Sequence, residues 1–97
     1  MNLPIIMSPA ADRDVEAAAS WYEEEAGSGT RFVARLQEAL DRIGQMPELH
    51  AVAYRDVRRA RVPKFPYNVY YRVLADRLEV LAVTHGRRDP DVWRSRA

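Results

Sequence analysis

The sequence FPYNVYYRVLADRLEVLAVTHGRR, residues 65–88, decides the fold of this chain. Val, Tyr, Leu and Thr dominate this stretch, and these side chains fit the pleated, half-buried surface of a β-sheet. The segment Ala75-Asp76-Arg77 interrupts it once, so the stretch predicts two long strands joined as a hairpin. The second strand, residues 78–85, is apolar on both faces except near its start and at its end. Such a pattern is typical of a strand inside a sheet or under a layer of helices.

Upstream of this hairpin the pattern predicts one strand and two helices. The apolar run over residues 3–7 predicts an edge strand, because a proline is tolerated at the start or edge of a strand. Ser8 and Pro9 suit the N-cap and the first position of a helix. After two glycines, a second helix is predicted over about residues 30–43, where Gly44 ends it. The short connection makes the two helices an antiparallel pair.

The remaining segments complete the fold class. Residues 50–54 predict a loop or a ragged strand, and residues 57–62 predict a strand. Asp89-Pro90 predicts the start of a short C-terminal helix, with Trp93 docking on the body of the protein. We therefore expect one α+β domain over residues 1–97, with an N-terminal strand, a helical hairpin on one face of a small, mainly antiparallel sheet, and a short C-terminal helix.

The composition excludes several kinds of chemistry. The 97 residues contain no Cys, so a disulfide framework and a thiolate metal site are excluded. The two histidines, His50 and His85, are too few for a His-based metal site without carboxylate help, and no phosphate-binding glycine motif is present. The N-terminus lacks a signal-peptide pattern, and no run approaches the roughly 20 apolar residues of a membrane span. We expect a cytoplasmic protein with no metal ion, cofactor or membrane contact.

The net charge of +1 conceals an asymmetry along the chain. Residues 1–50 hold four Arg and nine Asp or Glu, whereas residues 51–97 hold eleven Lys or Arg and five Asp or Glu. All but one of the 15 basic residues are Arg, which suits bidentate contacts with carboxylate or phosphate groups. The second half is therefore a candidate surface for an acidic partner or for nucleic acid, unless its charges form internal ion pairs or a solvated face.

Basic and aromatic residues interleave in this second half. The set comprises Arg58, Arg59, Arg61, Lys64, Tyr67, Tyr70, Tyr71, Arg72, His85, Arg87 and Arg88. Arginines beside aromatic rings can bind RNA phosphates, and a histidine among them can act as acid or base in RNA cleavage because histidine titrates near neutral pH. The alternative is structural: His85 would hydrogen-bond to backbone at a strand end, and the tyrosines would belong to the core of the sheet.

Trp21 allows two interpretations. It lies beside the apolar stripe of the first helix, so it could form the edge of the core. It could equally be an exposed anchor for a partner, because interfaces are enriched in Trp.

Three segments carry a resemblance to a known family. FPYNVYYRV at residues 65–73 and HGRRDP at residues 85–90, together with the alanine-rich opening SPAADRDVEAAASWY at residues 8–22, resemble toxins of the RelE/ParE superfamily. These are the toxic partners in bacterial type II toxin–antitoxin pairs. The similarity covers about residues 3–93, and the order of predicted elements agrees with it.

The resemblance favours the ParE-like branch, which poisons DNA gyrase, over the mRNA endonucleases of the same superfamily. Asn68 stands where a nuclease strand Arg would align, and Ala82 stands where many relatives have Arg. Loss of two cations would remove stabilisation of charge in the transition state. We expect a toxin that acts by binding, with no chemistry of its own. The alternatives are a ribosome-dependent mRNA endonuclease and an inactive toxin that only binds its antitoxin.

The resemblance also implies a partner, a ParD-like antitoxin of the ribbon-helix-helix class of DNA-binding proteins. The toxin would contact DNA only indirectly, through this antitoxin. Its amphipathic helix should lie beside the first helix and its carboxylates on the Arg-rich half. The expected antitoxin-binding residues are Trp21, Tyr22, Arg58, Arg59, Arg61, Tyr70 and Arg72. The expected target-binding residues are Arg87, Arg88, Trp93 and Arg94. The alternative nuclease would use Arg61, Arg72, Arg87 and His85.

Overall fold

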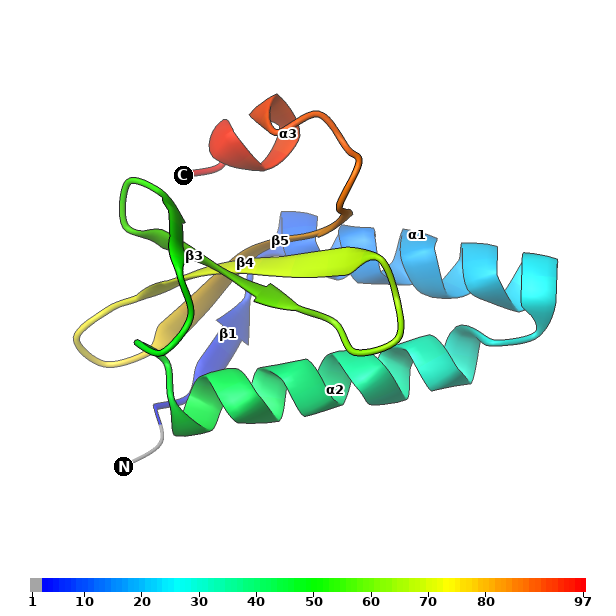
Figure 1. Cartoon of the computed structure of the whole chain (residues 1–97), viewed down its shortest axis with the longest axis horizontal. Helices are drawn as coiled ribbons and strands as arrows, with labels where there is room; N and C mark the ends of the chain where they lie inside the picture. Colours follow the sequence, from blue (N-terminus) through cyan, green and yellow to red (C-terminus); the bar gives the residue numbers. More distant parts are fainter. Residues whose placement is uncertain (1–2) are drawn as a thin grey trace.

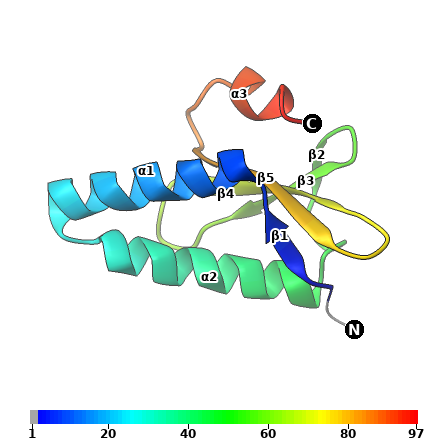
Figure 2. The same cartoon turned by 180° about the vertical axis from the view of Figure 1, so that it is seen from behind.

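The computed structural model of the chain describes residues 3–97. In chain order its elements are β1 (Ile5–Met7), α1 (Pro9–Ala26), α2 (Gly29–Gln45), β2 (Val52–Tyr54), β3 (Val57–Arg61), β4 (Tyr67–Val73), β5 (Leu78–His85) and α3 (Asp91–Arg94). The antiparallel helices α1 and α2 cover one face of a single sheet, and α3 packs on the other face (Figures 1 and 2). This arrangement confirms the predicted α+β fold.

The sheet has the strand order β1-β5-β4-β3-β2. β4 and β5 form the predicted hairpin, with Tyr67 opposite His85 and Val73 opposite Leu78. β5 lies between β1 and β4, which explains why it is apolar on both faces. β1 pairs with β5 in parallel at one edge, so the predicted edge strand is confirmed but is limited to Ile5–Met7.

A β-bulge interrupts the pairing of β4 with β5. Tyr70 lies opposite Ala82 and Tyr71 lies opposite Val80, so Leu81 is an extra residue on β5. An extra residue disrupts the ladder locally and leaves backbone groups without their strand partners. The backbone around Leu81 must therefore find its partners outside the hairpin.

Side chains from the two ends of the chain supply these partners. The carbonyl of Leu81 accepts a hydrogen bond from Nη1 of Arg96 at 3.1 Å, and the N–H of Val83 donates to Oδ2 of Asp14 at 3.0 Å. The Asp14 carboxylate also forms a two-point ion pair with the Arg96 guanidinium, at 2.6 and 3.2 Å. These hydrogen bonds and the ion pair thus connect the start of α1, the C-terminal segment and the bulge of β5.

The start of α1 follows the predicted capping pattern. Oγ of Ser8 accepts the N–H of Ala11 at 3.0 Å, and the proline at the first helical position lacks an amide that would need a partner. At its other end, Gly27 adopts a left-handed conformation with φ 61° and donates its N–H to the Glu23 carbonyl at 3.0 Å.

The predicted end of the second helix is wrong by two residues. Gly44 lies buried inside the last turn of α2, where a Cβ would lie 3.6 Å from Cδ1 of Ile5. The helix instead ends after Gln45, because the residue before a proline is pushed out of helical geometry. That residue is Met46, which precedes Pro47 and has φ −139°.

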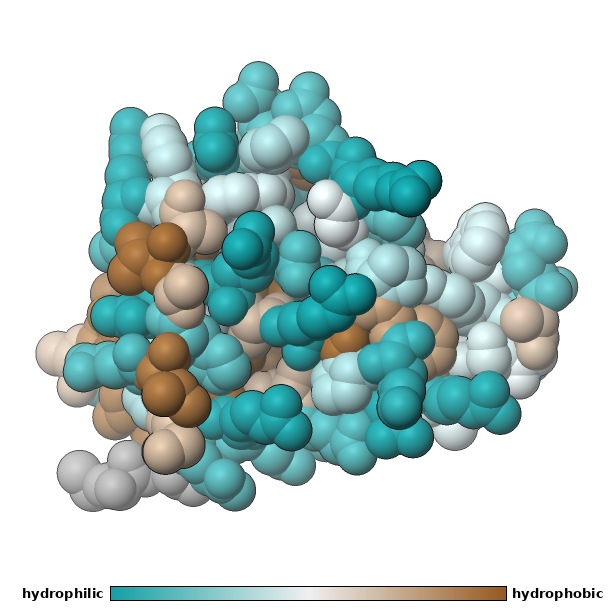
Figure 3. Space-filling model, viewed as in Figure 1, coloured by the Kyte–Doolittle hydropathy of each residue, from teal (hydrophilic) through white to brown (hydrophobic). Residues whose placement is uncertain are grey.

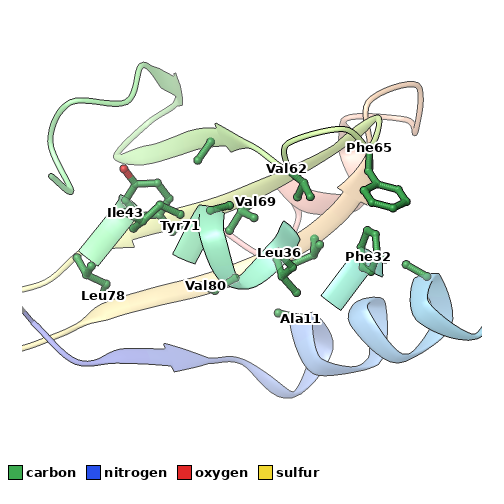
Figure 4. Close-up of a cluster of buried hydrophobic side chains, with 14 residues drawn as sticks. Ala11, Phe32, Leu36, Ile43, Val62, Phe65, Val69, Tyr71, Leu78 and Val80 are labelled. Carbon is green, nitrogen blue, oxygen red and sulfur yellow. The ribbon is translucent and has the colours of Figure 1, made fainter. Parts of the chain in front are cut away.

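The main core fills the space between the helical hairpin and the sheet (Figure 4). Ile43 of α2 lies beside Tyr71 of β4 at one end of this core, and Phe32 of α2 meets Phe65 edge-on at the other end, with ring centroids 5.2 Å apart. Ile43, Tyr71 and Phe32 are inaccessible to solvent. The Tyr71 hydroxyl donates a hydrogen bond to the Pro47 carbonyl, and burial raises its pKa to about 12. This contact ties the connection after α2 to the centre of the sheet.

A smaller core covers part of the opposite face of the sheet. Trp93 of α3 stacks on Tyr70, with ring centroids 4.0 Å apart, and both pack with Val57, Leu81 and Ala82. Trp93 is only 5% exposed, which confirms that it docks on the body of the protein. The sheet face opposite the helical hairpin is therefore partly covered by the protein's own C-terminal segment.

Candidate functional site

An aromatic cluster lies where the tip of the helical hairpin meets the sheet. The ring of Tyr22 stacks on Phe32 with centroids 5.4 Å apart and meets the ring of Phe65 edge-on at 4.8 Å. Trp21 packs edge-on against the other side of Tyr22 at 5.1 Å and is 55% exposed. Burial raises the pKa of Tyr22. Trp21 therefore lies outside the main core and is exposed, and its role as an anchor for a partner stays a prediction.

A pocket opens beside this tryptophan. It has a volume of about 420 Å³, and Trp21, Tyr22, Pro66, Tyr67 and His85 line it. β4 begins and β5 ends here, so the pocket joins the second half of α1 to one end of the sheet. Burial raises the pKa of Tyr67. We call this site the Trp21 pocket.

His85 has a structural partner within its own turn. Its Nδ1 accepts the backbone N–H of Arg87 at 3.0 Å, so the neutral ring carries its proton on Nε2. Its ring meets that of Tyr67 edge-on, with centroids 5.4 Å apart. The side chains of Arg87 and Arg88 that follow are exposed. This hydrogen bond matches the structural interpretation of His85.

The four candidate catalytic side chains do not meet. Arg61 and Arg72 each lie between two residues of the main core on their strands, so they point to the face opposite the helical hairpin. His85 points to the hairpin side, into the Trp21 pocket. Arg72 also lies five residues along β4 from Tyr67, the strand neighbour of His85, which is about 17 Å. There it pairs with Asp56 at 3.6 Å. Arg87 sits apart, in the exposed turn.

The arginines of β3 divide by face and by accessibility. Nη1 of Arg58 donates to the carbonyls of Glu48 and His50, at 3.1 and 2.7 Å, so this guanidinium holds the connection between α2 and β2. Arg59 and Arg61 are exposed on the face opposite the helical hairpin. Of the three, only Arg59 and Arg61 are free to meet a partner.

The predicted residues near the C-terminus divide in the same way. Tyr70 and Trp93 are buried against each other in the smaller core, so neither ring lies on the surface. Arg94 is exposed, and its guanidinium carbon lies 5.2 Å from the ring centroid of Tyr54 and 5.5 Å from that of Trp93. The accessible cations at this end are therefore Arg87, Arg88 and Arg94.

Sequence reasoning missed a second hollow, which we call the cationic cleft. It has a volume of about 460 Å³, and Arg31, Arg35 and Lys64 surround Tyr22 and Phe65 there. Arg31 and Arg35 are four residues apart and therefore share one face of α2, which the sequence could have indicated. Their proximity to Lys64 depends on how the helical hairpin packs on the sheet, and no local pattern encodes it.

A separate apolar patch lies at the other end of the molecule. Met46, Leu49 and Val52 are exposed around the connection between α2 and β2, where hydrophobic residues gather at the left of Figure 3. Most of the remaining surface in this view is hydrophilic. The Trp21 pocket lies at the hairpin tip, so the two apolar surfaces are far apart (Figure 1).

Two further properties bear on the kind of site present. Within residues 3–97, no group of three or more His, Asp or Glu side chains is arranged to hold a metal ion. No helix in this range is long and apolar enough to cross a membrane.

Comparison with known proteins identifies a similar fold and the family of the chain. The chain is similar to a solved chain described as "Chromosomal ParDE TA system from P. aeruginosa", with a TM-score of 0.76 and 17% sequence identity over 86% of this chain and 95% of that one. The sequence model described as "ParE toxin of type II toxin-antitoxin system, parDE" matches residues 5–90. The chain therefore belongs to the ParE toxin family. No curated protein matches it closely.

Proposed function

We propose that this toxin acts in the cytoplasm by binding a macromolecular target, DNA gyrase, and carries out no chemistry of its own. The observation that carries the proposal is the separation of the candidate catalytic side chains: His85 faces the helical hairpin, whereas Arg61 and Arg72 face away from it. RNA cleavage requires a proton-transferring group and charge-stabilising cations around one phosphate. A binding toxin requires only an accessible, complementary surface.

The exposed cations after β5 are the proposed target-binding surface. Arg87, Arg88 and Arg94 are exposed at the C-terminal side of the sheet. Arginine forms bidentate contacts with carboxylates, which suits an acidic patch on a protein target. Trp93 supports this surface from beneath by anchoring α3 on Tyr70.

The proposed antitoxin is ParD-like, a ribbon-helix-helix DNA-binding protein, and it would cover two accessible parts of the chain. Trp21 and Tyr22 offer aromatic surface at the hairpin tip, and Arg59 and Arg61 offer cations on β3. Arg58 donates to backbone carbonyls and Arg72 pairs with an aspartate, so we assign both to the toxin's own structure. Tyr70 is likewise assigned to the smaller core.

Expression of the chain in bacteria from a tightly controlled promoter tests this proposal. Gyrase poisoning is expected to give filamentous cells with an induced DNA-damage response, whereas an mRNA endonuclease would arrest translation and leave cut messages. Normal growth with expression verified on a gel would instead indicate an inactive toxin. Each of the last two outcomes contradicts the proposal.

Substitution of His85 sharpens the same experiment. His85→Ala removes the imidazole, and His85→Asn removes its acid–base capacity but retains an oxygen that can accept the Arg87 N–H. Both variants are expected to inhibit growth as the wild type does. Loss of growth inhibition in His85→Asn, with an unchanged melting temperature, would favour the nuclease.

A further inference from the structure

The cationic cleft draws its charges from two distant parts of the sequence. Arg31 and Arg35 extend from the first two turns of α2, and Lys64 extends from the turn between β3 and β4. Tyr22 and Phe65 provide the apolar part of the lining. Arg35 also forms an ion pair with Glu38, one turn further along α2, at 3.1 Å. Arg31 and Lys64 are therefore the two cations of the cleft that we assign to ligand binding.

The turn that carries Lys64 is fixed in shape. Pro63 and Pro66 enclose Lys64-Phe65, and Lys64 adopts a left-handed conformation with φ 70°. The N–H of Phe65 donates to the Val62 carbonyl at 3.4 Å, and Phe65 is buried in the main core. The cation is therefore presented from a rigid support, which reduces the entropy lost when a ligand binds.

The cationic cleft adjoins the Trp21 pocket. Tyr22 lines both, and the consecutive residues Phe65 and Pro66 line one each. Side by side they form one surface, with cations at one end and the exposed ring of Trp21 at the other. A ligand for the whole surface needs negative charge at one end and a bulky apolar group at the other.

We propose that this joint surface binds an acidic amphipathic segment of a protein, with carboxylates at Arg31 and Lys64 and a large apolar side chain in the Trp21 pocket. The identity of that protein as the antitoxin rests on the proposed function above. Charge complementarity over an apolar base matches how amphipathic segments dock into grooves. Arg31 and Lys64 would thereby be added to the antitoxin-binding residues expected from the sequence, which comprise aromatic residues and arginines of the sheet but neither of these two cations.

The charges around the cleft disfavour nucleic acid as the ligand. Glu23, Glu24 and Glu25 are exposed on α1, between Tyr22 and Ala26, which both line the cleft. None of these glutamates lines the cleft itself, but duplex DNA carries one negative charge per roughly 1.7 Å of its axis and extends beyond the cleft, where it would meet their carboxylates. A peptide carries discrete carboxylates that can be placed at the cations alone.

Charge reversal on the full-length chain tests the proposal. The probe is a purified ParD-like antitoxin, the partner proposed above, and its dissociation constant is measured by calorimetry at two salt concentrations. The double variant Arg31→Glu, Lys64→Glu should weaken binding by about 100-fold, because like charges placed opposite one another oppose association strongly. Trp21→Ala should weaken binding by about tenfold or more through loss of an aromatic anchor.

A matched double variant controls for net charge. Arg13→Glu, Arg77→Glu changes the net charge equally at exposed or partly exposed positions on the first turns of α1 and in the β4–β5 turn. Its affinity should stay within about threefold of the wild type, as expected for charges remote from an interface. Melting curves confirm that each variant is folded.

The outcomes separate the two proposals. If wild type and antitoxin form no complex, the assumed partnership is wrong and this inference falls with it. If the complex forms and the cleft variant binds as the control does, the cleft assignment alone is overturned. Binding of a single-stranded RNA or duplex DNA oligonucleotide that is lost in the cleft variant would also overturn it in favour of nucleic acid.

Discussion

At the scale of single residues, His50 lies in a setting that disfavours its charged form. Burial lowers the pKa of His50, and the nearby guanidinium groups of Arg42 and Arg58 lower it further. Its Nε2 is buried and has no hydrogen-bond partner among residues 3–97, and its ring meets that of Tyr71 edge-on at 6.1 Å. Protonation would place a third cation in this group, so the folded state favours the neutral ring.

This setting predicts a loss of stability in mild acid. The unfolded chain binds a proton at His50 near the ordinary pKa of about 6.5, whereas the folded chain binds it only at lower pH. The free energy of unfolding, from urea denaturation, should therefore be insensitive to this group above about pH 7 and fall as the pH drops below about 6.5. His50→Gln should show a shallower decline between pH 7 and 5. Equal slopes in the two proteins would contradict the prediction.

The sequence identified the basic residues of the second half of the chain, but it did not indicate which of them form contacts within the protein. Arg58 donates to backbone carbonyls at positions 48 and 50, and every residue type has a backbone carbonyl, so no side chain there signals the contact. Trp93 was predicted both to dock on the body and to meet the target, and the structure confirms the docking. Whether such a side chain packs inside the protein or meets a partner depends on its neighbours in the folded structure. The periodicity of the sequence does not specify those neighbours.

At the scale of elements, two glycines of α2 should respond oppositely to the same substitution. A Cβ on Gly29 would lie 2.7 Å from the Ala19 carbonyl oxygen of α1, so Gly29→Ala should force the helices apart and cost about 1–3 kcal/mol. A Cβ on Gly44 would meet only Cδ1 of Ile5, at 3.6 Å. Gly44→Ala should therefore stabilise the protein by about 0.5 kcal/mol through helix propensity. Thermal or urea unfolding of both variants provides the measurement, and a common sign would refute the argument.

The elements themselves were largely predictable, because their signals are local. Alternation and β-branched residues marked the β4–β5 hairpin, and Ser8-Pro9 marked the start of α1. The bulge at Leu81 was not predictable, since the extra residue is one more apolar side chain in an apolar strand. Its backbone is satisfied by Asp14 and Arg96, which are 82 residues apart in the chain.

At the scale of the whole molecule, the charge asymmetry along the sequence does not become one basic face. Arg31 comes from the acidic half, yet it joins Lys64 from the basic half in the cationic cleft. Arg58, Arg72 and Arg96 from the basic half are engaged within the protein. The accessible cations are therefore scattered, with groups at the cleft, on β3 and after β5 and further exposed arginines at positions 13, 42 and 55.

The separate positions of these cations predict that mutations can separate two properties: inhibition of growth by the toxin, and suppression of that inhibition by the antitoxin. His85 lines the Trp21 pocket and only Gly86 separates it from Arg87 and Arg88, so an antitoxin seated in the pocket would also screen those cations from the target. Arg87→Glu, Arg88→Glu should abolish growth inhibition, whereas the antitoxin affinity should fall far less than the roughly 100-fold expected for the cleft variant, because the anchoring contacts at Trp21 remain. The Trp21→Ala variant should still inhibit growth, and co-expression of the antitoxin should no longer restore growth of the cells. If both folded variants lost both properties, target and antitoxin would instead share one binding surface.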